Sequence, residues 1–535
     1  MLRSKLVIFC LLVSATAQGQ VNRYFISFKD KTGTPYSITN PSQFLSQKSI
    51  SRRQKQNIIL TEEDLPVNPN YVAQVKSTGA STYFTSKWFN GILVETDEAT
   101  LASVNALSFV SETILVAPGS KLTGGRVSKV KHRRNSSADQ PANQSQLQQI
   151  GIDEMQDSGY RGEGISIAIF DSGFIGVDVS SPFADLFSDN RVRQTFNFIK
   201  NNSGVYTADD HGTEVLSVMG AYTSGTYTGG AYKADYFLYV TEDIASEYRV
   251  EEYNWTFAAE HADSAGVDII NSSLGYNEFD DSSMDYKIAN LDGQTALVTK
   301  ASRKAIEKGM LVVCSAGNEG SNSWKFVTPP ADAAGILAVG SINRVGSLSS
   351  FSSRGPTADG RIKPDVVALG SGTSIIRSSG SLGSASGTSL ASPLVASLAA
   401  GVWQAFPTLT AQELHDAIIM SATLTSAPNN QMGYGIPHFR AIVNYLESLA
   451  ETEMISVYPN PVTDDRFEIR LKQPLDSPVQ ILIFDARGSR VAESTLKIDW
   501  ANNPFEYDIS QFKAGIYFVR VTSGNHTGTV RIVKL

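Results

Sequence analysis

The chain has 535 residues, of which 41% are hydrophobic, and its formal net charge at pH 7 is -8. This length exceeds one ordinary domain and predicts three or four parts. The acidic balance, with no domain-sized basic surface, excludes nucleic acid as an expected partner.

Residues 1–19 have the pattern of a secretory signal peptide. Two basic residues precede an apolar run at 6–13, and a small-x-small cleavage site ends at Ala17. The run is too short to span a bilayer. Cys10 lies within this segment, so Cys314 remains without a partner for an intrachain disulfide and is expected to be a core residue.

Residues 20–116 are predicted to form a small α+β domain. Asn90-Gly91 is a hairpin signal, and Asp97 is expected to cap a helix. Strands are expected at 24–28, 81–89, 91–95 and 109–116, with helices at 44–57 and 98–107.

Residues 117–146 interrupt this order with glycines, a basic run at 129–134 and a polar stretch. The basic run is able to touch an acidic surface. A solvated, protease-accessible linker is the favoured interpretation, because such a segment cannot bury a core. We expect a processing region here.

Residues 147–449 alternate between strand and helix patterns. Such alternation predicts a parallel sheet covered by helices on both faces, with functional residues at the carboxyl ends of the strands. Apolar strands are expected at 165–170, 236–240, 267–271, 310–314 and 336–339, and helices at 250–265 and 299–308.

Ser389 stands where small residues give way to an apolar helical pattern at 390–406. Pro393 is expected in the first turn of that helix, where a missing N–H costs little. Ser389 is interpretable as an ordinary N-cap, or as a nucleophile beside backbone N–H groups at the positive end of the helix.

Three further polar residues follow strands or begin helices. Asp171 ends an apolar strand, although Asp-Ser-Gly also forms turns, and His211 leads into an apolar helix, where a lone histidine is usually structural. Asn318 lies in a glycine-flanked turn. Acyl transfer by Ser389 requires a base, a carboxylate that orients the base and a donor for the oxyanion, and all are present.

The ordered set of these motifs resembles the subtilisin-like serine proteases of the subtilase family over about residues 150–445. By that resemblance Asp171 is the orienting acid, His211 the general base, Ser389 the nucleophile and Asn318 the side-chain oxyanion donor. The matching segments are 170–173, 211–213, 271–275, 316–320, 351–355, 363–367 and 387–393.

The resemblance also implies a substrate site and one departure from the family. Ser273, Leu274 and Gly275 match the edge segment that pairs with an extended substrate, and Glu319 lies near the first specificity pocket. Glu214 replaces a second histidine, either as a plain helix residue near a positive helix end or as a group that alters the pKa of His211.

The family resemblance implies that residues 20–116 are a propeptide that assists folding and inhibits the enzyme. No cofactor is required for the chemistry. Structural calcium is possible, but no metal ligands can be mapped, because the acidic stretch at 278–292 lacks the spacing of an EF-hand and is best interpreted as a solvated loop.

Residues 455–535 alternate with period two, which predicts a small antiparallel β-sandwich able to bind carbohydrate or partner proteins. The segments 458–461, 514–519 and 530–535 resemble the C-terminal sorting domain of the type IX secretion system. That resemblance implies a Gram-negative source related to the Bacteroidota, passage through the periplasm, interaction with the type IX machinery, and release or attachment at the outer-membrane surface.

Together these features predict a secreted serine endopeptidase that is made as a self-inhibited precursor and cleaves proteins or peptides. The fold class is α/β: a subtilisin-like parallel sheet sandwiched by helices, between the small α+β domain and the β-sandwich. Two alternatives remain. One is a surface binding protein that keeps the fold without turnover, and the other is a protease that processes only its own chain.

Overall fold

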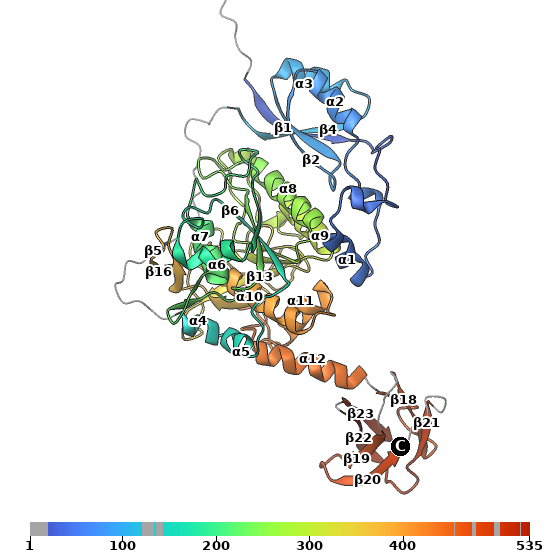
Figure 1. The fold of residues 1–535 in the computed structure, drawn as a ribbon. Helices are drawn as coiled ribbons and strands as arrows, with labels where there is room; N and C mark the ends of the chain where they lie inside the picture. Colours follow the sequence, from blue (N-terminus) through green and yellow to red (C-terminus); the bar gives the residue numbers. More distant parts are fainter. Residues whose placement is uncertain are drawn as a thin grey trace, which may run out of the picture. The chain divides into compact units, whose positions relative to one another are not determined.

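The structure is a computed structural model that describes residues 20–119, 133–134, 143–453, 455–472, 478–496, 503–524 and 526–535 (Figure 1). The chain divides into two compact units, residues 1–415 with 423–436, and residues 416–422 with 437–535. The predicted signal peptide and most of the predicted linker lie outside the described residues. Within those residues, no helix has both the length and the apolar character needed to cross a bilayer.

The N-terminal domain is a four-stranded antiparallel sheet with helices, as predicted. The sheet order is β2-β3-β1-β4. A helix at Pro69–Ser77 was not predicted, although its N-cap Asn68 accepts a hydrogen bond from Asn70 N–H at 2.9 Å. The elements are β1 (Asn22–Phe28), α1 (Gln47–Lys55), α2 (Pro69–Ser77), β2 (Ser81–Ser86), β3 (Gly91–Thr96), α3 (Glu98–Asn105) and β4 (Val110–Ala117).

Successive side chains of β1 serve two different cores, because neighbours in a strand point to opposite faces. Tyr24, Ile26 and Phe28 pack in the core of the N-terminal domain itself. Phe25 points the other way and stacks on Tyr253 of the following domain, with ring centroids 4.4 Å apart. The N-terminal sheet therefore docks through its second face.

A seven-stranded sheet forms the centre of the first unit, in the order β14-β13-β12-β11-β6-β10-β7. Every recorded pairing within it is parallel. The five predicted strands are present, and two were missed, the partly exposed strand β7 and the buried strand β14. The bounds are β6 (Ser166–Asp171), β7 (Val192–Asn197), β10 (Asp235–Val240), β11 (Ile269–Ser272), β12 (Leu311–Ser315), β13 (Leu337–Ile342) and β14 (Val366–Leu369).

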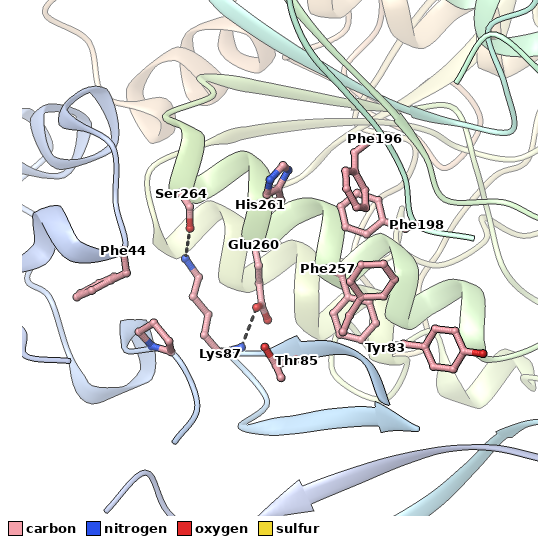
Figure 2. Close-up of a pocket in the computed structure, with 12 residues that line it drawn as sticks. Phe44, Tyr83, Thr85, Lys87, Phe196, Phe198, Phe257, Glu260, His261 and Ser264 are labelled. Carbon is pink, nitrogen blue, oxygen red and sulfur yellow. Dashed lines mark hydrogen bonds between the residues drawn. The ribbon is translucent and has the colours of Figure 1, made fainter. Parts of the chain in front are cut away.

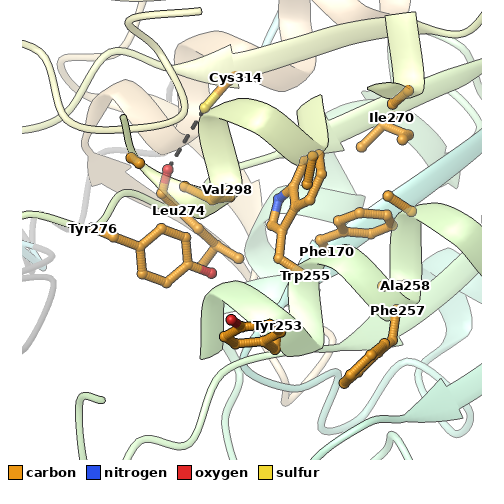
Figure 3. Close-up of a cluster of buried hydrophobic side chains, with 14 of the residues drawn as sticks. Phe170, Tyr253, Trp255, Phe257, Ala258, Ile270, Leu274, Tyr276, Val298 and Cys314 are labelled. Atoms are coloured by element: carbon orange, nitrogen blue, oxygen red, sulfur yellow. Dashed lines mark hydrogen bonds between the residues drawn. The ribbon is translucent and has the colours of Figure 1, made fainter. Parts of the chain in front are cut away.

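Helices pack on the sheet in two pairs, α7 with α10 and α8 with α9. Phe170 of β6 lies edge-on to Trp255 of α8, with ring centroids 5.2 Å apart, in the core that Figure 3 shows. Cys314 is buried in the same core, as predicted, and burial raises the pKa of its thiol to about 12. The helices are α7 (His211–Gly220), α8 (Val250–Ala265), α9 (Leu297–Glu307) and α10 (Thr388–Ala405).

The remaining short elements of the first unit are small helices and strands around this sheet. They include α4 (Gln144–Gln148), α5 (Ile152–Asp157), α6 (Ala184–Ser188), β5 (Arg133–Arg134), β8 (Tyr222–Thr223), β9 (Tyr227–Thr228), β15 (Thr373–Ile376) and β16 (Leu382–Ser386). The helix α11 (Ala411–Met420) contains the boundary between the units.

The second unit holds α12 (Phe439–Glu453) and two antiparallel sheets, β17-β18-β21 and β20-β19-β22-β23. Phe467, Ile481 and Val519 belong to one buried cluster to which both sheets contribute. The predicted sandwich is therefore present. Its strands are β17 (Ile455–Tyr458), β18 (Arg466–Leu471), β19 (Val479–Asp485), β20 (Arg490–Leu496), β21 (Phe505–Asp508), β22 (Gly515–Ser523) and β23 (His526–Lys534).

Candidate active site

Asp171 and His211 form a buried hydrogen-bonded pair. Asp171 is the last residue of β6, and His211 is the first residue of α7. The Oδ1 atom of Asp171 accepts hydrogen bonds from His211 Nδ1, at 2.7 Å, and from the Ser172 backbone N–H, at 2.8 Å. Because Nδ1 carries the proton in this bond, the neutral imidazole has Nε2 as its basic atom.

Glycines in the two motifs allow this approach. A Cβ atom on Gly212 would lie 2.5 Å from the Gly173 carbonyl oxygen and 3.0 Å from the Asp171 Cβ. A Cβ atom on Gly173 would lie 2.6 Å from the backbone nitrogen of Asp209. The sequences Asp-Ser-Gly and His-Gly-Thr therefore have glycine where the start of α7 lies against the end of β6.

The electrostatic environment of His211 favours its protonated form. Burial disfavours the imidazolium, but the carboxylate of Asp171, its hydrogen bond and the charge of Glu214 outweigh burial and raise the pKa of His211. Glu214 is 2% exposed and lies one turn along α7. This position supports the interpretation that Glu214 acts on the pKa of His211.

Ser389 is the second residue of α10 and is 1% exposed. Its Oγ has no hydrogen-bond partner among the described residues. The expectation for Pro393 was wrong, because it is the sixth helical residue and lies in the second turn. Since Pro393 has no N–H to give to the Ser389 carbonyl, that carbonyl instead accepts a hydrogen bond from Ser273 Oγ at 2.9 Å.

Asn318 is held beside the start of α10. Its Oδ1 accepts hydrogen bonds from the Thr388 backbone N–H, at 2.9 Å, and from the Thr388 hydroxyl, at 3.0 Å. A backbone N–H can only donate, so this contact fixes which end of the amide is the oxygen. The amide NH₂ of Asn318 therefore points away from Thr388 and is available as a donor.

The predicted substrate segment follows β11 directly. The Ser273 and Leu274 side chains are buried, and the Leu274 carbonyl accepts a weak hydrogen bond from the Cys314 thiol. Glu319 is partly exposed and accepts a hydrogen bond from the side-chain amide of Asn322. Gly275 is partly exposed, and a Cβ there would meet Thr328 Oγ1.

The structure thus brings several predicted site residues together. Asp171 and His211 are in contact, Asn318 contacts Thr388, and Ser273 contacts Ser389. The helices that begin near His211 and Ser389, α7 and α10, pack side by side. Within the described residues, Glu319 instead forms hydrogen bonds with Asn322 and, through its backbone N–H, with Ser353.

Two acidic residues of α8 that sequence reasoning missed bind the N-terminal domain. Glu260 accepts hydrogen bonds from Ser86 Oγ, at 2.5 Å, and from the backbone N–H groups of Lys87, at 2.7 Å, and Trp88, at 3.1 Å. Burial raises the pKa of Glu260 to about 7, although Lys87 and these hydrogen bonds oppose the shift. The sequence feature that could have identified these residues is an acidic residue on the buried side of a helix.

Asp263, one turn beyond Glu260, forms ion pairs with three cations of the N-terminal domain. Its oxygens lie 2.6 Å from Arg52, 2.7 Å from Arg53 and 2.7 Å from Lys87. Burial disfavours its charge, but the cations outweigh burial and hold the pKa of Asp263 well below its ordinary value.

An aromatic pocket of about 430 Å³ lies beside these acids. Phe196, Phe198, Phe257 and His261 line it on the side of the central sheet and α8 (Figure 2). Phe84 of β2 contributes from the N-terminal domain, with ring centroids 5.3 Å from those of both Phe198 and Phe257.

Comparison with known sequences matches three parts of the chain to families. Residues 162–435 match the subtilase family, residues 23–136 match the peptidase S8 propeptide domain of the Bacteroidota, and residues 456–535 match a secretion system C-terminal sorting domain. The last two matches point to a secreted or cell-surface protein of the Bacteroidota.

Two subtilisins agree with the subtilase match. The chain is 31% identical over 282 residues to subtilisin of Bacillus pumilus, covering 52% of this chain and 90% of that protein. It is also 31% identical to subtilisin E of Bacillus subtilis strain 168, again over 52% of this chain but 65% of that protein. The CspB protease of Clostridium perfringens has a TM-score of 0.48 at 17% identity, covering 56% of this chain and 98% of that structure.

The protein is therefore a serine peptidase, a hydrolase that acts on peptide bonds. More narrowly, the chain belongs to the subtilase family.

Proposed function

We propose that the protein is a secreted endopeptidase in which Asp171, His211 and Ser389 form the catalytic triad. The observation that carries this assignment is the buried 2.7 Å hydrogen bond between Asp171 and His211, which fixes the imidazole with Nε2 as its base. Ser389, with a buried hydroxyl at the start of the neighbouring helix α10, supplies the nucleophile.

In the proposed reaction the Ser389 Oγ attacks the substrate carbonyl carbon while its proton passes to His211 Nε2. His211 then gives that proton to the amine as the peptide C–N bond breaks. Water repeats the sequence on the acyl-enzyme, releasing the carboxylic acid and restoring Ser389. The carboxylate of Asp171 stabilises the imidazolium in both halves.

The oxyanion is assigned to two donors, the side-chain NH₂ of Asn318 and the backbone N–H of Ser389. The hydrogen bonds from Thr388 to Asn318 Oδ1 support the first assignment, since they leave the amide donor facing elsewhere. The second rests on the free N–H groups of the first helical turn. These steps use only groups of the chain, so we assign no cofactor to the chemistry.

Protein and peptide substrates are proposed to bind in extended form along residues 273–275. The buried Ser273 and Leu274 side chains anchor the segment and leave its backbone to pair with the substrate. Glu319 is proposed to lie near the first specificity pocket.

The N-terminal domain is proposed to keep the precursor inactive until it is cleaved within residues 117–146. Its contacts with Glu260 and Asp263 support a tight complex. We assign export to the type IX machinery, through the periplasm, with release or attachment at the outer-membrane surface, on the basis of the sorting domain.

The test is to incubate the full chain and its Ser389→Ala variant with a serine-directed fluorophosphonate and a denatured protein, then measure intact masses. We expect labelling at Ser389, loss of the N-terminal domain and substrate cleavage in the wild type alone. Cleavage confined to residues 117–146 would indicate a protease that serves only its own maturation. A wild type that neither labels nor cleaves after removal of the N-terminal domain would refute the proposed triad.

A further inference from the structure

Three glutamates outside the proposed triad converge in the first unit. Glu242 lies just after β10, Glu247 lies in the following loop, and Glu251 lies in the first turn of α8. One carboxylate oxygen from each lies within 4.8 Å of the others. Calcium–oxygen distances place ligands on opposite sides of an ion about 4.6 to 5.2 Å apart, so one ion can contact all three carboxylates.

Neighbouring groups hold two of these carboxylates in place. The Tyr276 hydroxyl donates a hydrogen bond to Glu242 Oε1. The Asp243 backbone N–H donates to Glu251 Oε1 at 3.1 Å. Each contact engages one oxygen of its glutamate, and the arrangement is thus largely formed by the fold itself.

Glu251 provides an independent sign that this group binds a ligand. Its side chain is 1% exposed, and its Oε2 atom has no hydrogen-bond partner among the described residues. Within the described residues, no lysine or arginine forms an ion pair with any of the three glutamates. Asp280, which accepts the Glu247 backbone N–H at 3.2 Å, adds further negative charge. Buried charge without compensation is strongly unfavourable.

Two kinds of partner can neutralise this group, namely protons and cations. Burial raises the pKa of all three, and that of Glu242 to about 7. The charge of Asp171 adds to the shift of Glu242, and the charges of the neighbouring glutamates add to the shifts of Glu247 and Glu251. A divalent cation competes with these protons, because only the deprotonated carboxylates bind it.

We propose that Glu242, Glu247 and Glu251 bind a calcium ion. All three ligands are hard carboxylate oxygens, with no histidine or cysteine in the group, which disfavours zinc. Calcium accepts irregular arrangements of six to eight oxygens, whereas magnesium requires a near-ideal octahedron and sheds water reluctantly. Water completes the coordination.

The ion would join three parts of the first unit that lie near the proposed substrate segment. Glu242 follows β10, which pairs with β6 so that Val240 lies opposite Asp171. Tyr276, which holds Glu242, directly follows Gly275. Binding at this point therefore stabilises the connection between β10, α8 and the chain after β11.

The test uses the full chain with Ser389→Ala, which is expected to stay uncleaved, and titrates it with CaCl₂ or MgCl₂ at pH 8. We expect calorimetry to detect calcium binding with a Kd of about 1 mM or lower, as in extracellular calcium modules. At calcium concentrations near 100 times that Kd, Tm should rise by about 5 °C. Magnesium at the same concentration should produce a smaller rise.

Two variants and a matched control locate the site. Either Glu251→Gln or Glu247→Gln is added to the Ser389→Ala chain, and Glu247 is the partly exposed position of the two. Each substitution should weaken calcium binding at least about tenfold, because one of three charged ligands is lost. The control is Glu252→Gln, which alters the adjacent buried carboxylate, whose oxygens face the Tyr286 hydroxyl and the Val298 N–H. It should retain the calcium-dependent rise in Tm even if its starting Tm is lower.

Three results would overturn the proposal. The first is the absence of calcium binding in the parent chain. The second is equal calcium affinity in the Glu247→Gln variant and the Glu252→Gln control, which would place the ion elsewhere. The third is binding of a lysine- or arginine-containing peptide, but not of calcium, that is lost in Glu247→Gln, which would make the group a subsite for basic side chains.

Discussion

The two ends of α8 bury acidic side chains in opposite electrostatic surroundings. Near its C-terminal end, Asp263 lies among Arg52, Arg53 and Lys87, and its pKa is lowered. In its first turn, Glu251 faces other carboxylates, and its pKa is raised. Burial is nearly complete at both positions, so the partners decide whether a buried acid is stably charged.

Substitution of Asp171, the acid paired with His211, should have the largest effect. In the mature enzyme, Asp171→Asn should lower kcat by about 10⁴, because an amide does not hold the imidazole in the required tautomer. The measurement is kcat on a peptide substrate, with Tm as a check that the fold is retained. A loss below about tenfold would mean that His211 does not depend on this carboxylate.

Asp263→Ala tests the paired acid at the domain interface. In the full chain carrying Ser389→Ala, it should lower the free energy of unfolding by about 3 to 5 kcal/mol, because it leaves buried cations without their partner.

The matched control is Lys48→Met, which breaks the ion pair with Asp268, where Lys48 is 42% exposed. An exposed pair contributes about 1 kcal/mol or less. Urea unfolding of both variants gives the comparison, and equal losses would contradict the importance of burial.

Glu260 lies between these two cases, because its carboxylate is bound mainly by N–H and O–H donors. Its folded-state pKa of about 7 lies above its ordinary value of 4.5. It therefore stabilises the fold fully below about pH 4.5, and this contribution is lost as pH rises through about 7.

In the Ser389→Ala chain, Glu260→Gln should remove a decline of up to about 3 kcal/mol between these pH values. The measurement is the difference in free energy of unfolding between variant and parent across pH 4.5 to 7. A difference that does not change with pH would contradict the raised pKa.

Glu214 should give the smallest effect. Its charge helps to raise the pKa of His211, so Glu214→Gln should lower that pKa and keep the imidazole basic at lower pH. The acid limb of the kcat/KM profile should move down by about one pH unit or less, given the size of such charge effects. Glu163→Gln, a substitution in a different segment, serves as the control, and an unchanged acid limb in Glu214→Gln would contradict the assignment.

Much of the fold could be predicted because buried parallel strands are continuous apolar runs. The strand expected at 165–170 corresponds to β6, and the helix expected at 250–265 coincides with α8. The strand β7 was missed because it mixes polar and apolar residues, and most of its side chains are only partly buried. Short strands such as β15 have little periodicity to reveal them.

The position of Pro393 shows why local rules fail inside a helix. A proline is unfavourable there because it leaves a carbonyl four residues earlier without its donor. The required donor is the hydroxyl of Ser273, which is distant in the sequence and reaches Ser389 only in the folded chain. Helix propensity alone could not anticipate this compensation.

The sequence by itself determined the family, the order of Asp171, His211, Asn318 and Ser389, and their positions at strand ends and helix starts, because motif spacing and hydrophobic periodicity are local properties. The tertiary structure decided which acids are paired. Asp263 forms ion pairs with Arg52 and with Lys87, and Glu242 lies close to Glu251 across a loop. The pKa of a buried group depends on such contacts, whose partners come together only when the chain folds.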